Sequence, residues 1–366
     1  MSAIQNRSDL QQALQEIVDS GFAGVQVRVN DEHGEWVGSA GVRKLGETEK
    51  PSTDGHFRIG SNTKTFVAVL TLQLVADGQV GLDTPVDDYL PEYGLDREIT
   101  VRMLLQHTSG VFNFTGEHFP DGTIAPGIPW EGQGYVDGLS HTYDPEELVR
   151  LALSKPARFA PGTDWSYSNT NYVLLKLLIE RVSGRSLAEE MQDRILGPLG
   201  LTGTVVPGAS PEIPAPHAHG YYRYEEAGEW KLVDVTRMNP SWISAAGDMI
   251  STTKDLHIFI AALTGGKLLP AELLAEMYEA YPQIGYGLGV FVQQTECGDT
   301  VITHNGGFFG WGALMYGSPD GRTTLTASLT TGDAELDFIA TAQAFQAAQQ
   351  KLVNLAFCAG QAEPAA

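Results

Sequence analysis

Cysteine is scarce in this chain, whose 366 residues contain only Cys297 and Cys358. Two cysteines so far apart do not form a zinc site, so they are either two free thiols or one disulfide that ties the C-terminal helix to a strand. The sequence also lacks the HExxH, CxxC, P-loop, GxGxxG and GxSxG patterns. These absences disfavour a metal-dependent hydrolase and a hydrolase of the α/β-hydrolase type, and we expect no cofactor and no metal.

Positively charged residues are also scarce. The chain has 23 Lys and Arg residues against 45 Asp and Glu residues, which gives a formal net charge of -22 and a pI of about 4.7. Such a surface repels phosphate backbones and anionic lipids, so we expect neither nucleic-acid nor membrane binding. The expected partner is a small-molecule or peptide substrate, and we expect a monomer.

Long apolar runs are absent as well. No stretch of 18 or more apolar residues occurs, which argues against a transmembrane helix. The N-terminus, "MSAIQNRSDLQQALQEIVDSG", has neither a basic start nor an apolar stretch before a small-residue cleavage site. We therefore expect a cytoplasmic protein if Met1 is the native start; the alternative is a secreted protein whose signal peptide has been removed.

Strand-like alternation occurs near both ends of the chain, and helical patterns fill the middle. Residues 24–42 alternate around an Asp-Glu-His-Gly turn and predict a hairpin, and strand patterns return after about residue 285. The exception in the middle is a hairpin expected at 220–234. We predict an α+β fold with an antiparallel sheet built from both chain ends, flanked by terminal helices, and a large, mostly helical inserted subdomain. The predicted units are 1–65 with 285–358 for the α/β subdomain, 66–284 for the helical subdomain, and 359–366 for a tail.

A serine and a lysine stand three residues apart at the head of an apolar segment, in "SNTKTFVAVLTLQLV". At the start of a helix, Ser61 and Lys64 share one face and lie within contact distance. A serine hydroxyl is a weak nucleophile until a base takes its proton, and a neutral lysine amine can serve if burial and the helix N-terminus lower its pKa. No polar residue other than Thr and Gln follows Lys64 up to Val75, so this helix is expected to be buried.

The same spacing recurs in "STTKDLHIFIAAL", with Ser251 and Lys254. Here the pattern indicates the start of an amphipathic helix, with Ser251 or Thr252 as the N-cap. Lys254 and Asp255 are expected to face solvent, which leaves no reason for a base at this position. We therefore assign the catalytic hypothesis to Ser61 and not to Ser251.

Two further stretches can complete a site around Ser61. "WSYSNTNY" places Tyr167 and Asn169 before an apolar helix, where they either cap that helix or handle a proton and orient Lys64. "VITHNGGFFGW" places His304 and two glycines at a strand end. The glycines either serve a turn or let a substrate approach, with the Gly307 N–H as an oxyanion donor.

The motifs SxxK, YxN and HxG occur in this order, and with them the sequence resembles the serine β-lactamase and penicillin-binding family, class C branch. Within it the likeness is closest to the Streptomyces DD-carboxypeptidase/transpeptidase type. The resemblance covers nearly the whole chain. It extends to the segments "FRIGSNTKTF", "LLQHTSGVFNF", "PGTDWSYSNTNYVL", "SWISAAGDMISTTKDL" and "YGLGV", and to the positions of Cys297 and Cys358.

The resemblance implies an acyl-enzyme mechanism. Ser61 would be the nucleophile, Lys64 and Tyr167 would share the general base and acid roles, and His304 would stand where many relatives have a lysine. The N–H groups of Ser61 and Gly307 would form the oxyanion hole. The residues expected to bind substrate are Asn169, Asn305, Gly306, Trp242, Phe112 and Phe114, although ordinary core packing explains the aromatic ones equally well.

One departure from the family pattern bears on the substrate. The carboxypeptidase relatives hold a substrate carboxylate with hydroxyls of an HTGT-like motif and an arginine on the preceding strand. Here the motif reads HNGG, and "GVFVQQTECG" contains no arginine. We predict a serine acyl-enzyme hydrolase that cleaves an amide or ester bond, of DD-peptidase, D-amino-acid amide or esterase type. The alternatives are an acyltransferase or amide synthase that passes the acyl group from Ser61 to an amine, and a non-catalytic penicillin-binding sensor.

Overall fold

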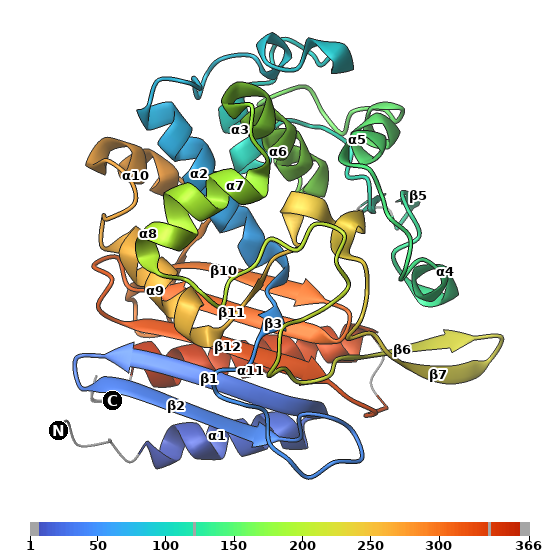
Figure 1. Ribbon diagram of the computed structural model, residues 1–366, viewed down its shortest axis with the longest axis vertical. Coiled ribbons are helices and arrows are strands. Elements are labelled where there is room, and N and C mark those ends of the chain that lie inside the picture. The colour runs from blue at the N-terminus through green and yellow to red at the C-terminus, as the bar shows by residue number, and fades with distance from the viewer. Residues whose placement is uncertain (1–6, 120–121, 336–337, 359–366) are drawn as a thin grey trace.

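The computed structural model describes residues 7–119, 122–335 and 338–358, and Figure 1 shows how they are arranged. The predicted tail, 359–366, lies outside the described residues. The central layer is a six-stranded sheet in the order β2-β1-β12-β11-β10-β9, and all its neighbouring strands are antiparallel. Its strands are β1 (Phe22–Asp31), β2 (Gly34–Gly41), β9 (Phe291–Gln294), β10 (Thr300–Phe308), β11 (Trp311–Gly317) and β12 (Thr324–Thr331).

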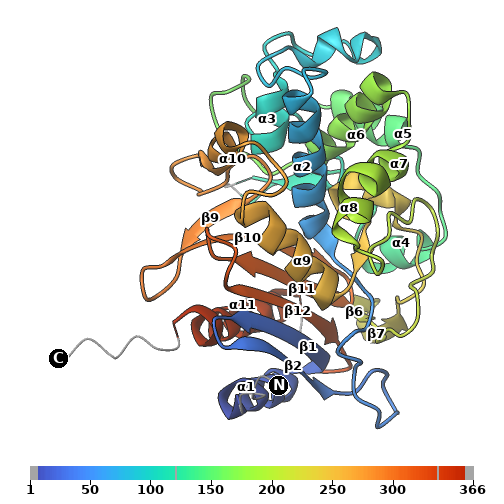
Figure 2. The ribbon, with the colours of Figure 1, turned by 60° about the vertical axis from the view of Figure 1, so that its left-hand side comes forward.

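The two ends of the chain meet in the middle of this sheet. Strand β1 pairs with β12 along its length, so that Val25 lies opposite Leu329. Helices α1 (Ser8–Asp19) and α11 (Phe338–Phe357) cover one face, as Figure 2 shows, and their apolar side chains share a core with β1 and β12. The predicted antiparallel sheet from both chain ends, with terminal helices and a helical insertion, is confirmed.

The segment between β2 and β9 is mainly helical. Its helices are α2 (Thr63–Ala76), α3 (Val101–Gln106), α4 (Gly132–Asp137), α5 (Pro145–Leu153), α6 (Asn169–Ser183), α7 (Leu187–Met191), α8 (Gly197–Leu199), α9 (Thr253–Thr264) and α10 (Ala271–Tyr278). Three short antiparallel pairs accompany them: β3 (Phe57–Arg58) with β8 (Ile250–Ser251), β4 (Gly116–His118) with β5 (Ile124–Pro126), and β6 (Tyr221–Glu226) with β7 (Glu229–Asp234). No helix in the described part of the chain is long and apolar enough to cross a membrane.

Helix α2 is the centre of the larger core. Its residues from Thr63 to Leu72 are all buried, and Phe66 stacks on Phe259 of α9 with ring centroids 3.6 Å apart. Helix α9 therefore contacts α2 on one side. It also contacts the sheet, where Thr326 of β12 donates a hydrogen bond to the carbonyl of Thr253. The boundaries of the two predicted subdomains stay a prediction.

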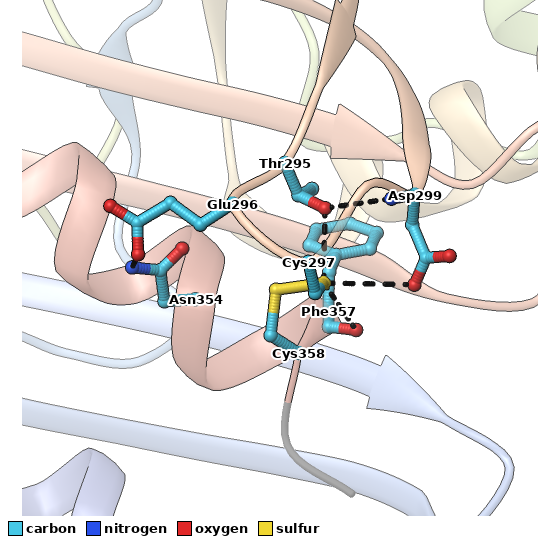
Figure 3. The surroundings of a disulfide bond; sticks show 7 residues. All are labelled: Thr295, Glu296, Cys297, Asp299, Asn354, Phe357 and Cys358. Atoms are coloured by element: carbon cyan, nitrogen blue, oxygen red, sulfur yellow. Dashed lines mark hydrogen bonds between the residues drawn. A yellow bond between two sulfur atoms is a disulfide. The ribbon is translucent and has the colours of Figure 1, made fainter. Parts of the chain in front are cut away.

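A disulfide joins Cys297 to Cys358. Cys297 lies in the turn between β9 and β10, and Cys358 directly follows α11 (Figure 3). Beside the disulfide, the side chain of Asn354 on α11 donates a hydrogen bond to Glu296 in the same turn. Of the two alternatives that the sequence left open, the structure therefore has the disulfide, and it ties the end of α11 to the sheet.

Candidate active site

Ser61 lies in a single 3-10 turn, Gly60–Asn62, that leads directly into α2. This continuous helical path places Ser61 and Lys64 on the same side, as the three-residue spacing predicts. The Nζ atom of Lys64 lies 3.2 Å from Ser61 Oγ. Ser61 is partly exposed and Lys64 is fully buried, so the hydroxyl is open to a substrate while the amine is shielded from water.

Lys64 has two further hydrogen-bond partners. Its Nζ lies 2.9 Å from Oδ1 of Asn169 and 2.6 Å from the carbonyl oxygen of Ala246. Both oxygens only accept hydrogen bonds. A neutral amine has two N–H groups and one lone pair, so when its N–H groups bind these oxygens the lone pair faces Ser61 Oγ. The geometry is therefore that of a base aimed at the nucleophile.

Burial lowers the pKa of Lys64 well below the ordinary 10.5 of a lysine. The cause is desolvation, which disfavours the charged amine. Within the described residues, no carboxylate lies among the hydrogen-bond partners of Lys64 to offset this effect. The position of Lys64 at the start of α2 acts in the same direction, since a helix N-terminus carries partial positive charge.

The hydroxyl of Tyr167 lies 2.8 Å from Ser61 Oγ, on a segment that leads into α6. Burial raises the pKa of Tyr167 well above its ordinary value of 10. Tyr167 is consequently a neutral phenol near neutral pH, suited to donate a proton and not to remove one. Lys64 Nζ also lies 4.6 Å from the centre of the Tyr167 ring, so the serine, the lysine and the tyrosine form one compact group.

His304 lies on β10 and is buried, and its two ring hydrogen bonds are to residues other than Ser61, Lys64 and Tyr167. Its Nδ1 is 2.7 Å from the carbonyl oxygen of Asn305, and its Nε2 is 3.3 Å from the hydroxyl of Tyr286. Burial and the neighbouring Lys64 lower the pKa of His304 to about 3, so the imidazole is neutral near neutral pH. The carbonyl of Asn305 requires a proton on Nδ1, which leaves Nε2 to accept from Tyr286. A catalytic role for His304 stays a prediction.

Two glycines allow the Ser61 turn to lie against β10. A Cβ on Gly60, whose φ is +51°, would come within 3.0 Å of the backbone nitrogen of Gly307. A Cβ on Gly306 would come within 1.9 Å of the carbonyl oxygen of Ile59 and 3.0 Å of the Ser61 nitrogen. The structure therefore brings the backbones of Ser61 and Gly307 together, as an oxyanion hole requires.

The structure does not bring every predicted substrate residue to Ser61. The side chain of Asn305 donates a hydrogen bond to Gln349 of α11, on the other face of the sheet. Phe114 is fully buried in the large core, and Phe112 is also buried and offers its carbonyl to Thr170. For these three side chains the packing explanation fits the structure better than substrate binding.

Asn169 contacts Lys64 directly, whereas Trp242 lies beside the end of β10, and a substrate-binding role for either stays a prediction. Asn169 is the first residue of α6 and holds Lys64 through Oδ1, while its Nδ2 lies 3.4 Å from Thr115 Oγ1. Trp242 is partly buried, and its ring centre lies 5.2 Å from that of Phe308 at the end of β10.

Sequence reasoning missed several residues that support the site. The carbonyl of Ala246 carries no side-chain signal, although it stands within the quoted segment "SWISAAGDMISTTKDL". His107 stands in "LLQHTSGVFNF"; its Nδ1 accepts from the N–H of Ser168, and its ring centre lies 4.4 Å from that of Tyr167. Asn113 accepts a hydrogen bond from the backbone N–H of Asn169. These residues hold the segment that carries Tyr167 and Asn169.

Similarity to known proteins identifies the family of this chain. Residues 10–349 match the family model described as Beta-lactamase, and the chain therefore belongs to the β-lactamase family. A solved structure of a D-stereospecific amidohydrolase from Streptomyces sp. is 35% identical, with a TM-score of 0.83, and the match covers 98% of this chain and 100% of that one.

Two curated relatives carry other names. Penicillin-binding protein 4* of Bacillus subtilis (strain 168) is 27% identical over 301 residues, which cover 78% of this chain and 63% of that protein. Esterase EstB of Burkholderia gladioli is 36% identical over 166 residues, which cover 43% of this chain and 40% of that protein. The match thus spans less than two thirds of the length of each of these relatives.

Proposed function

We propose that this protein is a serine hydrolase that cleaves an amide or ester bond of a substrate without a carboxylate, through an acyl-Ser61 intermediate. The observation that carries this proposal is the arrangement around Lys64. Its buried amine binds two oxygens that only accept hydrogen bonds, and in the neutral amine the lone pair then faces Ser61 Oγ. A lysine whose pKa is lowered by burial and that contacts a serine hydroxyl is suited to general-base catalysis.

The steps follow from the contacts. Lys64 takes the proton of Ser61 Oγ, which attacks the substrate carbonyl carbon, and the N–H groups of Ser61 and Gly307 stabilise the oxygen that gains charge. When the tetrahedral intermediate collapses, the bond to the leaving nitrogen or oxygen breaks, and Tyr167 donates a proton to that atom. We propose that the proton on Lys64, whose Nζ lies 4.6 Å from the centre of the Tyr167 ring, then restores the phenol. Water then attacks the acyl carbon by the same steps in reverse and releases the acid and free Ser61.

The preference for a substrate without a carboxylate rests on the electrostatics of the site. Tyr167 and His304 are uncharged near neutral pH, and burial lowers the pKa of Lys64 well below 10.5 and so disfavours its charged form. A substrate carboxylate placed beside them would lose hydration without gaining a cation. This argues against β-lactamase and DD-carboxypeptidase activity. It favours amides or esters of D-amino acids, the class suggested by the similarity to the D-stereospecific amidohydrolase.

Transfer to an amine and hydrolysis share the acylation half of the reaction, so the acceptor needs its own measurement. We propose water as the default acceptor. Product analysis with and without an added primary amine separates the two, because a hydrolase yields only the acid in both cases. An amide product that grows in proportion to the amine would instead assign acyl transfer.

Intact-mass spectrometry tests the proposal. The protein is incubated with D-phenylalanine amide, a D-Ala-D-Ala peptide, p-nitrophenyl acetate and penicillin. We expect an acyl adduct from the amide and the ester, and none in the Ser61→Ala variant. Ser251→Ala is the matched control, since it removes the serine of the second SxxK motif and should leave the adduct unchanged. Adducts only from the carboxylate-bearing peptide and penicillin, or no adduct at all, would reject the proposed substrate class or the enzyme itself.

A further inference from the structure

A cavity of about 510 Å³ is lined by Gly307 and by the turn between β10 and β11. Its walls come from parts of the chain that are far apart in sequence. The β6–β7 hairpin contributes Tyr222 and Trp230, the turn itself contributes Phe309, and two further segments contribute Trp130 and Trp242. Small and apolar residues of α11, among them Ala342, close the far side. Because aromatic rings dominate its walls, we call this cavity the aromatic groove.

The aromatic side chains pack against one another and so form a fixed wall. The ring of Phe309 lies 4.0 Å from that of Tyr222 and 5.6 Å from that of Trp130, measured between ring centres. Trp242 also contacts Phe308, which precedes Phe309 in the chain. Three separate segments therefore meet over the turn after Gly307, as in a built binding site that is largely pre-formed.

The charge in the aromatic groove does not favour an anionic ligand. The one cation among the described residues that line it is Arg223, whose guanidinium lies 4.3 Å from the centre of the Trp230 ring. Arg223 also forms an ion pair with Glu335 at 3.7 Å. Since Glu131 and Glu225 also line the cavity, a carboxylate would meet negative charge there, whereas an uncharged aromatic or aliphatic group would find apolar surface.

Gly307 connects the aromatic groove to the reactive centre. Its backbone lies against the Ser61 turn, through the close approach at Gly60, and it also lines the groove. Tyr167, which would donate a proton to the leaving group, does not line the groove, and neither does Lys64. A substrate whose carbonyl oxygen points at the Ser61 and Gly307 N–H groups therefore places its leaving group toward Tyr167 and its acyl part toward the groove.

We infer that the aromatic groove binds the acyl part of the substrate, and that the natural substrate is an amide or ester whose acyl part has no carboxylate and carries a bulky aromatic or aliphatic arm. This inference rests on the proposed function, since it takes Ser61 as the nucleophile. It goes beyond that function because it assigns the specificity to Phe309, Trp130, Tyr222 and Trp230. None of these residues touches the proton-transfer group around Ser61.

The test compares p-nitrophenyl esters of acetic, butyric, 4-phenylbutyric and succinic acid on the purified protein. We expect kcat/KM for the 4-phenylbutyrate to exceed that for the acetate by roughly tenfold or more, because added apolar groups in a fitting pocket are worth such factors. The succinate, whose arm ends in a carboxylate, should react no faster than the butyrate. Phe309→Ala and Trp230→Ala should bring the 4-phenylbutyrate-to-acetate ratio toward one.

Two controls keep the outcome interpretable. Trp230 is 48% exposed, so Trp230→Ala should fold even if Phe309→Ala does not. Phe119→Ala removes an aromatic ring that is 37% exposed and does not line the groove, and it should leave the ratio unchanged. A ratio near one in the unmodified protein, or a ratio that none of the groove variants lowers, would overturn the inference.

Binding without chemistry separates this inference from the proposed function. In Ser61→Ala, calorimetry with 4-phenylbutyramide and acetamide should show binding of the first only, and Trp230→Ala should weaken it. Acyl adducts with all esters but no difference between the two amides would reject the groove and leave the function intact. Selective binding of 4-phenylbutyramide without any ester adduct would reject the function and leave an apolar binding site.

Discussion

Replacing Lys64 by Met tests whether the buried amine is uncharged at its working pH. Methionine is about as long as lysine and does not titrate, so the two proteins differ in one ionisable group. In the unfolded chain Lys64 has an ordinary pKa of 10.5, and in the folded protein burial lowers that pKa. Between the two pKa values the unfolded chain binds one proton more than the folded protein does.

The sign and size of the effect follow from this proton count. Because the unfolded state binds the extra proton, the free energy of unfolding of the unmodified protein rises with pH, relative to the variant, by about 1.4 kcal/mol per pH unit. The rise levels off above pH 10.5, where both states are neutral. It begins at the folded-state pKa of Lys64, so the point at which the two curves start to diverge reads that pKa directly.

Urea unfolding at half-unit pH steps gives the two curves, and the pH dependence of acylation gives an independent reading. We expect kcat/KM for p-nitrophenyl acetate to fall as the pH drops through the folded-state pKa of Lys64. His304 does not explain such a fall, because it takes up its proton only near pH 3. Stability curves that stay parallel up to pH 10 would show that Lys64 is charged in the folded protein, and would refute the general-base argument.

Three further predictions use other contacts. Tyr167→Phe should slow acylation by an amide by roughly 100-fold or more, and acylation by a p-nitrophenyl ester much less, because nitrophenolate leaves without a proton; equal losses in stopped-flow assays would contradict the role of Tyr167. Gly306→Ala should lower the melting temperature sharply, since its Cβ would meet the Ile59 carbonyl at 1.9 Å, whereas a Cβ on Gly307 meets nothing within 4 Å and Gly307→Ala should fold normally. Calorimetric melting of both variants decides this. Breaking the disulfide that closes 61 residues should cost about 4 kcal/mol in the chain-entropy model; an unchanged urea midpoint for the Cys-to-Ser double variant would show that the crosslink does not stabilise the fold.

Local patterns in the sequence were sufficient for most of the sheet. The alternation over residues 24–42 predicts a hairpin, and the structure has β1 and β2 there, while the hairpin expected at 220–234 is β6 and β7. Both signals depend only on neighbouring residues. The pairing of β1 with β12 joins residues some three hundred positions apart, and only the family resemblance and the position of strands at both ends pointed to it.

The candidate site was predictable where chemistry depends on side chains at short spacing. Ser61 and Lys64 contact each other because one helical turn separates them. The partners that make Lys64 a base were not predictable in the same way, since the carbonyl of Ala246 belongs to no motif and its position is set by how a distant turn packs on α2. The aromatic groove could not be predicted from the sequence either, because its wall residues come from separate segments that only the fold brings together.

The second SxxK motif shows how much of the burial of a site residue spacing alone can predict. Lys254 is exposed, as its helix pattern predicts, but the expectation that Asp255 faces solvent is wrong. Asp255 is buried and accepts hydrogen bonds from the N–H of Gly203 and the hydroxyl of Thr204, on a segment that no local pattern connects to it. Ser251 contacts the same Thr204 hydroxyl at 2.9 Å. The two motifs thus differ in what the fold packs around them: at residue 64 it buries the lysine against a serine that stays partly exposed, and at 251–254 it buries the serine and leaves the lysine in water.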